Sequence, residues 1–426
     1  MDIYFIGIYI VLWVVTFYVY QRKRKTFDAG SFILFLYILT AIASFFLYRD
    51  DYYGSTFRGL SLFTFLLLFV LLFTEAYPVL KYDGRKKNLV TPNKRLIVVI
   101  SLVFIVSSLM GVSSTLQNFR QGIVMMLTTD EGGAELYKEA LESNENMGHG
   151  GLSNIFSVLI TALTNISALF LFYLIKSYKE HKLLVWSMAF SFVLLFMRYI
   201  SMGTRGSVVE FLLLLIASYL LMKPYYSRKI TSIVNKVIVV FAILVSIPII
   251  AISVSRFSNQ SGTSGVGSST LYYGGQGNLY FNKYALDNNG IRYGDRVIPL
   301  FKRMAFFSNV PHNFWERRAK YPHLKINDEV FVTFAGDFLF DFGPLFGSFI
   351  LIFFSLLFLQ ITRARGNLIE FHQLIILHMI TIICSQGAIK LFPLSDVGGN
   401  LQIIVYILAF FAFKSSKHNV KPTTTE

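Results

Sequence analysis

The chain of 426 residues is 54% hydrophobic and 15% charged, with a formal net charge of +15. Soluble domains carry roughly 25% charged residues, so this composition excludes an ordinary soluble fold and indicates a membrane protein. The single cysteine, Cys384, excludes an intramolecular disulfide framework and a zinc site built on cysteines. Most lysines and arginines lie in short loops between apolar runs, which favours a role in membrane topology and argues against nucleic acid as a partner.

Apolar runs of near 20 residues predict an all-α polytopic membrane protein with about eleven transmembrane helices. No small-residue cleavage site follows the first run, so it is interpreted as a retained span and not as a signal peptide. The predicted spans cover residues 2–20, 31–48, 59–78, 96–112, 152–175, 183–202, 206–222, 235–254, 343–361, 371–389 and 400–413.

The loops that follow the odd-numbered spans are strongly basic, and the basic tail continues this pattern. Short basic loops face the cytoplasm in membrane proteins. The N-terminus is therefore predicted outside the membrane and the C-terminus inside. The predicted regions are 1–254 with eight spans and an outward segment at 113–151, a large outward loop at 255–342, and 343–426 with three spans and a cytoplasmic tail.

The outward loop at 255–342 is too long for a simple connection, and such loops are uncommon unless they are functional or disordered. Its first part, NQSGTSGVGSST, is rich in glycine and serine and predicts a flexible linker. The remainder is rich in tyrosine and basic residues, which is not the composition of a disordered segment. This remainder is therefore expected to be structured and functional.

Charged residues also occur at the hairpin between the sixth and seventh spans, where Arg198 and Arg205 flank a turn and Glu210 follows inside an apolar run. Such a charge costs on the order of 2.5–3.5 kcal/mol at mid-helix, so it usually marks a site or a paired contact. Arg198 and Glu210 are each six residues from the turn, which predicts an ion pair at similar depth. The pair either permits insertion alone or positions the two arginines to bind an anion such as phosphate.

The long outward loop carries basic residues on the side where membrane topology does not require them. They form either a surface for anionic lipid headgroups or a site for a lipid-linked pyrophosphate. The tyrosines of this loop suit either sugar stacking or an interfacial aromatic belt. The candidate binding residues are Arg256, Arg292, Arg296, Arg303, Arg317, Tyr272, Tyr273 and Tyr280.

Two carboxylates, Asp337 and Asp341, precede the ninth span at a spacing of four, so they share a helix face. They serve either as a general base or as partners of the outer arginines. His312 is a further candidate base, because an imidazole takes up a hydroxyl proton near neutral pH. No metal-binding or nucleotide-binding motif is present in the sequence, so neither a metal nor a cofactor is expected.

The span number, the late outward loop and two sequence elements resemble the bacterial oligosaccharide repeat-unit polymerases, the Wzy-type polymerases of O-antigen and capsule. The elements are GTRGSVVEFLLLL at 203–215 and TFAGDFLFDFGPLFG at 333–347. By architecture the resemblance covers most of the chain. By motif it rests on the residues near 198–210 and 333–347.

The resemblance implies a GT-C-like helix bundle in the bacterial cytoplasmic membrane that polymerises oligosaccharide repeat units without a metal. The implied substrates are two undecaprenyl-pyrophosphate-linked oligosaccharides held beside membrane lipid. A hydroxyl of one attacks the anomeric carbon of the other with inversion, and undecaprenyl pyrophosphate leaves. In this family outward arginines contact the pyrophosphate, and Arg198 and Arg205 fit that position. The resemblance also allows a chain-length regulator protein as a partner.

Two other functions fit the same composition. A lipid-sugar transferase similar to the O-antigen ligases differs only in its acceptor. A flippase for the lipid-linked oligosaccharide is expected to show internal repeats and charges along a central cavity. The sequence has no repeat of fixed period, and its charges gather at one face of the predicted membrane domain.

Overall fold

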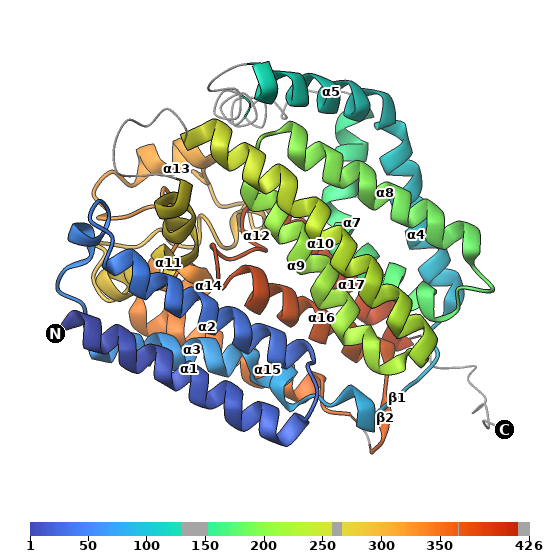
Figure 1. The fold of residues 1–426 in the computed structure, drawn as a ribbon, viewed down its shortest axis with the longest axis horizontal. Helices are drawn as coiled ribbons and strands as arrows, with labels where there is room; N and C mark the ends of the chain where they lie inside the picture. The colour runs from blue at the N-terminus through green and yellow to red at the C-terminus, as the bar shows by residue number, and fades with distance from the viewer. Residues whose placement is uncertain (129–135, 137–151, 258–265, 365, 416–426) are drawn as a thin grey trace.

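The computed structural model describes residues 1–128, 136, 152–257, 266–364 and 366–415 (Figure 1). These residues form an all-α bundle with one two-stranded parallel sheet. The α-helices are α1 (Asp2–Arg24), α2 (Ala29–Tyr48), α3 (Leu62–Lys81), α4 (Lys94–Met110), α5 (Val112–Thr128), α7 (Leu152–Lys176), α8 (Lys182–Ser201), α9 (Arg205–Met222), α10 (Arg228–Phe257), α11 (Val266–Tyr284), α12 (Pro299–Met304), α13 (Phe314–Lys320), α14 (Thr333–Phe342), α15 (Pro344–Ile361), α16 (Phe371–Gln386) and α17 (Asp396–Ser415). The short elements are η1 (Gly54–Phe57), η2 (Gly84–Lys86), η4 (Lys223–Tyr225), β1 (Asn88–Leu89) and β2 (Leu368–Ile369).

Each of the eleven predicted spans coincides with one of these helices. Within the described residues, nine helices are long and apolar enough to cross a membrane, and the bent pair of α4 and α5 makes a tenth. The helix of the predicted span at 371–389, α16, has 16 residues and is buried along its whole length. Nine to ten long apolar helices confirm a polytopic membrane architecture, whereas α16 is too short to count as a span by the same criterion.

The predicted basic loops meet at one end of the bundle. Arg24 forms an ion pair with Asp83 at 2.9 Å, which joins the loop after α1 to the loop after α3. β1 and β2 pair the loop after α3 with the loop after α15. Lys94 bonds Glu180 at 2.8 Å and brings in the loop after α7. The alternation of basic loops along the sequence therefore corresponds to a common end in space.

The opposite end carries the N-terminus of α1 and the four helices α11 to α14 (Figure 1). These four helices belong to the region predicted as the long loop at 255–342, which we call the long segment. The predicted flexible linker is wrong for its described part, because the chain is helical from Val266 onward. The small residues of α11 permit a close approach to α2: a Cβ at Gly275 would lie 2.6 Å from the carbonyl carbon of Ala43. Asn278 Nδ2 donates to Ser44 Oγ at 3.0 Å across the same contact. The long segment is therefore packed against the bundle.

The outward segment predicted at 113–151 begins with a helix. α5 turns by 55° from α4 and packs beside α8 (Figure 1). Gly122 of α5 approaches α8 closely, since a Cβ there would lie 3.1 Å from the Cα atom of Ser201. The bend therefore places α5 over the end of α8.

Candidate functional site

A cavity of about 800 Å³ opens where the long segment meets the ends of α7, α8 and α17. We call it the arginine cavity, because four guanidinium groups line it against two carboxylates. Its arginine, histidine and aspartate lining residues are Arg198, Arg296, Arg303, His312, Arg317, Asp328 and Asp396. The sequence predicted the first five of these as site residues, and the fold brings all seven together from α8, the long segment and the start of α17.

Arg198 projects into the arginine cavity from the last turn of α8. Its Nη2 donates to Ser157 Oγ of α7 at 3.0 Å. The predicted ion pair with Glu210 is wrong: Glu210 Oε1 accepts instead from Lys390 Nζ at 2.7 Å, and Arg198 forms no ion pair within the described residues. Lys390 follows α16 and reaches across to α9 beside Gly206, which has no side chain to block it. The charge of Arg198 therefore remains available to a ligand.

Arg205 does not line the arginine cavity, although it is only seven residues from Arg198. It begins α9 and is buried, with its guanidinium carbon 4.5 Å from the ring centroid of Tyr273 in α11. Tyr273 also packs against Phe331. The structure therefore separates the two arginines that were predicted to form one anion site.

Beneath the arginine cavity lies a buried layer of ion pairs. Asp337 and Asp341 share one face of α14, as their spacing predicted, and neither carboxylate is exposed. Arg292 contacts both, with Nη2 at 3.0 Å from Asp337 Oδ1 and Nε at 2.6 Å from Asp341 Oδ1. Asp337 also pairs with Arg296 Nε at 3.2 Å. The arginine-pairing alternative is confirmed, and no oxygen of either carboxylate reaches the cavity to act as a base.

A second group of ion pairs is centred on Asp328. Its Oδ2 accepts from Arg317 Nε at 2.6 Å and from Arg296 Nη1 at 3.3 Å. Burial raises the pKa of this carboxyl, but the guanidinium groups of Arg317 and Arg296 outweigh burial and lower the pKa below its ordinary value. Asp328 is therefore a carboxylate that fixes two of the cavity arginines in place.

Asp396, at the start of α17, was not predicted as a site residue. Its side chain is 50% exposed, and its Oδ1 accepts from Arg317 Nη1 at 2.8 Å. Its backbone has a φ of 57°, in the left-handed region that few residues other than glycine adopt. Its amide donates to the carbonyl oxygen of Arg296 at 2.9 Å. The strained backbone therefore places a solvent-accessible carboxylate at the wall of the cavity.

His312 and Arg303 lie on the loop side of the same cavity. His312 is exposed, and its backbone amide donates to Glu316 Oε2 at 2.7 Å. Arg303 Nη2 donates to the carbonyl oxygen of Pro311 at 2.6 Å, while its buried Nε has no hydrogen-bond partner among the described residues. An unsatisfied buried donor of this kind costs about 1–3 kcal/mol, which a bound anion would recover.

The remaining predicted residues lie elsewhere. Tyr272 and Tyr280 share a hydroxyl contact of 3.1 Å and pack against Tyr53 and Phe57 beside α2. Neither lines the arginine cavity. The side chain of Arg256 lies outside the part of the chain whose side chains are described.

Comparisons with protein-family models, with curated proteins and with solved structures found no match to this chain.

Proposed function

We propose that the chain is a membrane glycosyltransferase that polymerises oligosaccharide repeat units carried on a polyprenyl pyrophosphate such as undecaprenyl pyrophosphate. The observation that supports this proposal is the arginine cavity, in which Arg198, Arg296, Arg303 and Arg317 converge at one end of the apolar bundle. Arginine binds phosphate oxygens through two parallel charge-assisted hydrogen bonds and stays charged at any workable pH. A pyrophosphate whose lipid remains in the bilayer fits this position.

The four arginines are not equivalent. Arg296 and Arg317 are held by carboxylates, so their orientation is fixed before a ligand binds. Arg198 and Arg303 form no ion pair within the described residues, and their contacts are to a hydroxyl and a carbonyl oxygen. We therefore assign the direct pyrophosphate contacts to Arg198 and Arg303. The other two arginines make the electrostatic potential of the cavity more positive.

In the proposed reaction, a hydroxyl oxygen of one lipid-linked oligosaccharide attacks the anomeric carbon of the other. The glycosidic carbon–oxygen bond forms, the bond to pyrophosphate breaks, and the leaving group departs with the electron pair. Arginines already oriented toward the leaving group stabilise its developing charge, and removal of one such group typically costs on the order of 10²–10³ in rate. The hydroxyl proton goes to a base in the cavity.

We assign that base to Asp396. Its half-exposed carboxylate lies at the cavity wall, and its contact with Arg317 fixes its position. His312 lines the same cavity from the loop side and is the second candidate. A positioned side chain that accepts the proton in the transition state contributes typically 10²–10⁴ in rate.

The test is the glycan ladder of cells that lack this gene, compared on a gel with cells in which the gene is restored. Collapse of the polymer ladder to one repeat attached to the lipid core supports the polymerase. Loss of all core-attached sugar, with long polymer accumulating on the carrier lipid, identifies a ligase. An unchanged ladder rejects both enzymes and favours a flippase or a non-enzymatic protein.

A further inference from the structure

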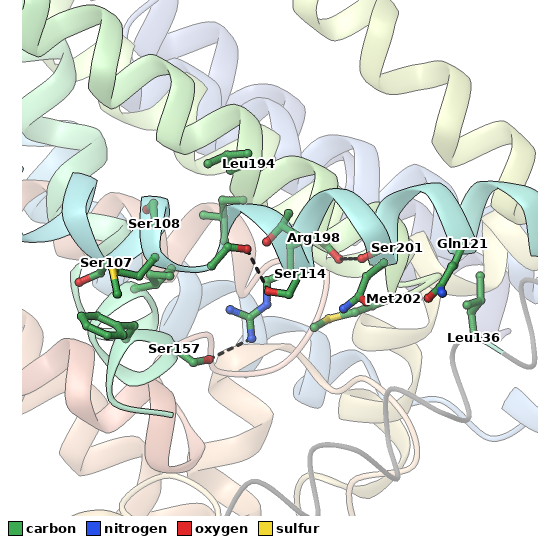
Figure 2. A pocket seen from close by; sticks show the side chains of 18 of the residues that line it. Ser107, Ser108, Ser114, Gln121, Leu136, Ser157, Leu194, Arg198, Ser201 and Met202 are labelled. Atoms are coloured by element: carbon green, nitrogen blue, oxygen red, sulfur yellow. Dashed lines mark hydrogen bonds between the residues drawn. The ribbon is translucent and has the colours of Figure 1, made fainter. Parts of the chain in front are cut away.

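A second cavity, of about 720 Å³, borders the arginine cavity. It lies between the C-terminal ends of α4 and α8 and the N-terminal end of α7, and α5 covers it. Both cavities have Ser157 and Arg198 in their lining. Figure 2 shows the guanidinium of Arg198 directed toward Ser157, with the polar side chains of α5 close by. Arg198 therefore lies at the boundary between the two cavities.

The lining of this second cavity differs in chemistry from that of the arginine cavity. Arg198 is its one charged side chain among the described residues, and most of its other polar groups are hydroxyls and amides. We call it the hydroxyl–amide cavity. Its polar side chains are Ser107, Ser108, Ser114, Thr115, Asn118, Gln121, Ser157 and Ser201.

The helix α5 supplies one continuous polar face to the hydroxyl–amide cavity. Ser114, Asn118 and Gln121 are spaced by four and three residues, so their side chains lie on the same side of the helix. Within the described part of the chain, no hydrogen bond uses the side-chain amide of Asn118 or Gln121, and both residues are exposed. Four amide donors and two carbonyl acceptors are thus available to a ligand in this cavity.

Apolar residues complete the lining, among them Phe156, Leu194 and Leu195. Saccharides have apolar C–H faces and hydroxyl groups at their edges. A saccharide site therefore needs apolar side chains as well as hydrogen-bonding groups. A second anion would lack a second cation here, and a hydrocarbon chain would leave the amides unsatisfied. An uncharged saccharide is the ligand class that this mixture of groups fits best.

We propose that the hydroxyl–amide cavity binds the uncharged sugars of the oligosaccharide, with Arg198 at the junction between the sugars and their pyrophosphate. This inference rests on the proposed function and names the part of the substrate that this cavity takes. The cavity holds saccharide through Asn118 and Gln121, while phosphate stays in the arginine cavity. Sugar binding and phosphate binding are therefore separable by mutation.

The test uses cysteine protection in the full-length protein. The one native cysteine, Cys384, is buried and is replaced by serine. Gln121→Cys places a thiol in the hydroxyl–amide cavity, and Leu116→Cys places one on another face of α5, at an exposed position outside the cavity lining, as the control. The rate of maleimide alkylation is measured with and without the repeat-unit oligosaccharide, released by mild acid from its lipid carrier, and separately with inorganic pyrophosphate.

We expect the oligosaccharide to slow alkylation of Gln121→Cys severalfold and to leave the alkylation rate of Leu116→Cys unchanged, while inorganic pyrophosphate slows neither. Equal rates at position 121 with and without oligosaccharide overturn the proposal, as does equal protection at both positions. This readout needs no polymer formation. A gene deletion that leaves the ladder unchanged therefore rejects the polymerase without deciding whether the cavity binds sugar.

A second measurement places a bulky side chain in the cavity. Ser114→Trp fills the space beneath α5, whereas Ser113→Trp points the same group away from the lining, because Ser113 is exposed outside it. We expect Ser114→Trp to shorten the ladder to single repeats and Ser113→Trp to leave it at normal length, at equal protein levels. A normal ladder from Ser114→Trp overturns the proposal even when the deletion strain confirms the polymerase.

Discussion

Arg317 in α13 donates from Nη1 to Oδ1 of Asp396 at 2.8 Å and so joins the long segment to the start of α17. The two residues are 79 positions apart in the sequence. The same guanidinium contacts the buried carboxylate of Asp328 through Nε at 2.6 Å. One arginine thus fixes a buried carboxylate and a half-exposed one, and only the exposed carboxylate, Asp396, is accessible to a substrate hydroxyl in the cavity.

Asp396→Asn tests the assignment of the base. The amide oxygen still accepts a hydrogen bond from Arg317, but it does not take up a proton. We expect chain growth to fall by about 10²–10⁴ while the protein level in the membrane stays unchanged. Growth rate is measured from the glycan ladder and protein level by immunoblot. His312→Gln is the comparison: loss of growth in His312→Gln with normal growth in Asp396→Asn transfers the role to the histidine.

The buried layer predicts a different outcome for Asp341→Ala. Removing this carboxylate leaves the buried Arg292 with one partner fewer, and breaking a buried pair costs about 3–5 kcal/mol. We expect a marked decrease in thermal stability in detergent and a low protein level. Asp287→Ala is the matched control, because its pair with Lys325 lies on the surface. Equal stability of the two variants would be incompatible with a structural role for Asp341.

Acidification tests the charge of Asp328. Although burial raises the pKa of this carboxyl, Arg317 and Arg296 lower it below its ordinary value of 3.8. A carboxyl whose pKa is lower in the folded than in the unfolded chain stabilises the fold above the unfolded pKa, and this contribution is lost as the pH falls through the folded pKa. We expect the thermal stability in detergent to decrease below about pH 4.

Asp328→Asn provides the control for this pH dependence. The variant has no titrating group at this position, so its stability should be lower near neutral pH and should change less on acidification than that of the wild type. Identical pH profiles for the two proteins would show that other carboxyls cause the loss.

Hydropathy predicted the positions of the helices, although α16 is too short to count as a span, and basic-loop alternation predicted that the basic loops share one end of the bundle. Both signals depend on local composition. The spacing of Asp337 and Asp341 also predicted their shared face, and pairing with arginine was one of the two roles expected of them. Lys390 and Asp396 were missed because both lie in a short polar break before the last span, where nothing local indicates a contact with Glu210 or Arg317. Contacts between distant segments depend on tertiary packing, which a single sequence does not show.

The same limit explains the linker prediction. Glycine and serine indicate flexibility when the surrounding structure is unknown, yet the linker residues from Val266 onward belong to α11, which contacts α2 closely further along at Gly275. The hairpin prediction failed for a related reason. Arg198 and Glu210 are equally far from the turn, which places them at similar depth in the bundle. This spacing does not determine which neighbouring helix each side chain faces.

Glu210 and Lys390 provide a direct test of that corrected pair. Glu210→Gln and Lys390→Met each remove one side of a partly exposed ion pair of 2.7 Å. Each is expected to lower stability by up to about 1 kcal/mol, and the double variant should lose less than the sum. The stability losses of Glu210→Gln and Arg198→Ala should instead add in their double variant, because these two residues do not form an ion pair with each other. Thermal unfolding in detergent measures both double-mutant cycles. Coupling between Glu210 and Arg198, with none between Glu210 and Lys390, would support the ion pair predicted from the sequence.

Arg198 and Arg205 distinguish binding from packing. Arg198 lines both cavities and has no carboxylate partner within the described residues, so Arg198→Ala should reduce chain growth by about 10²–10³ at an unchanged protein level. Arg198→Lys keeps the charge but not the bidentate geometry, and it should restore only part of the activity. Arg205 is buried against Tyr273, so Arg205→Ala should act mainly on stability.

The two arginine variants are compared by ladder length per unit of membrane protein, with thermal unfolding measured in parallel. A stable but inactive Arg205→Ala protein would place Arg205 in contact with substrate and would favour the anion site predicted from the hairpin. Normal ladder length in Arg198→Ala would contradict its assigned pyrophosphate contact, since the unpaired guanidinium at the boundary of two cavities is the feature that singles it out.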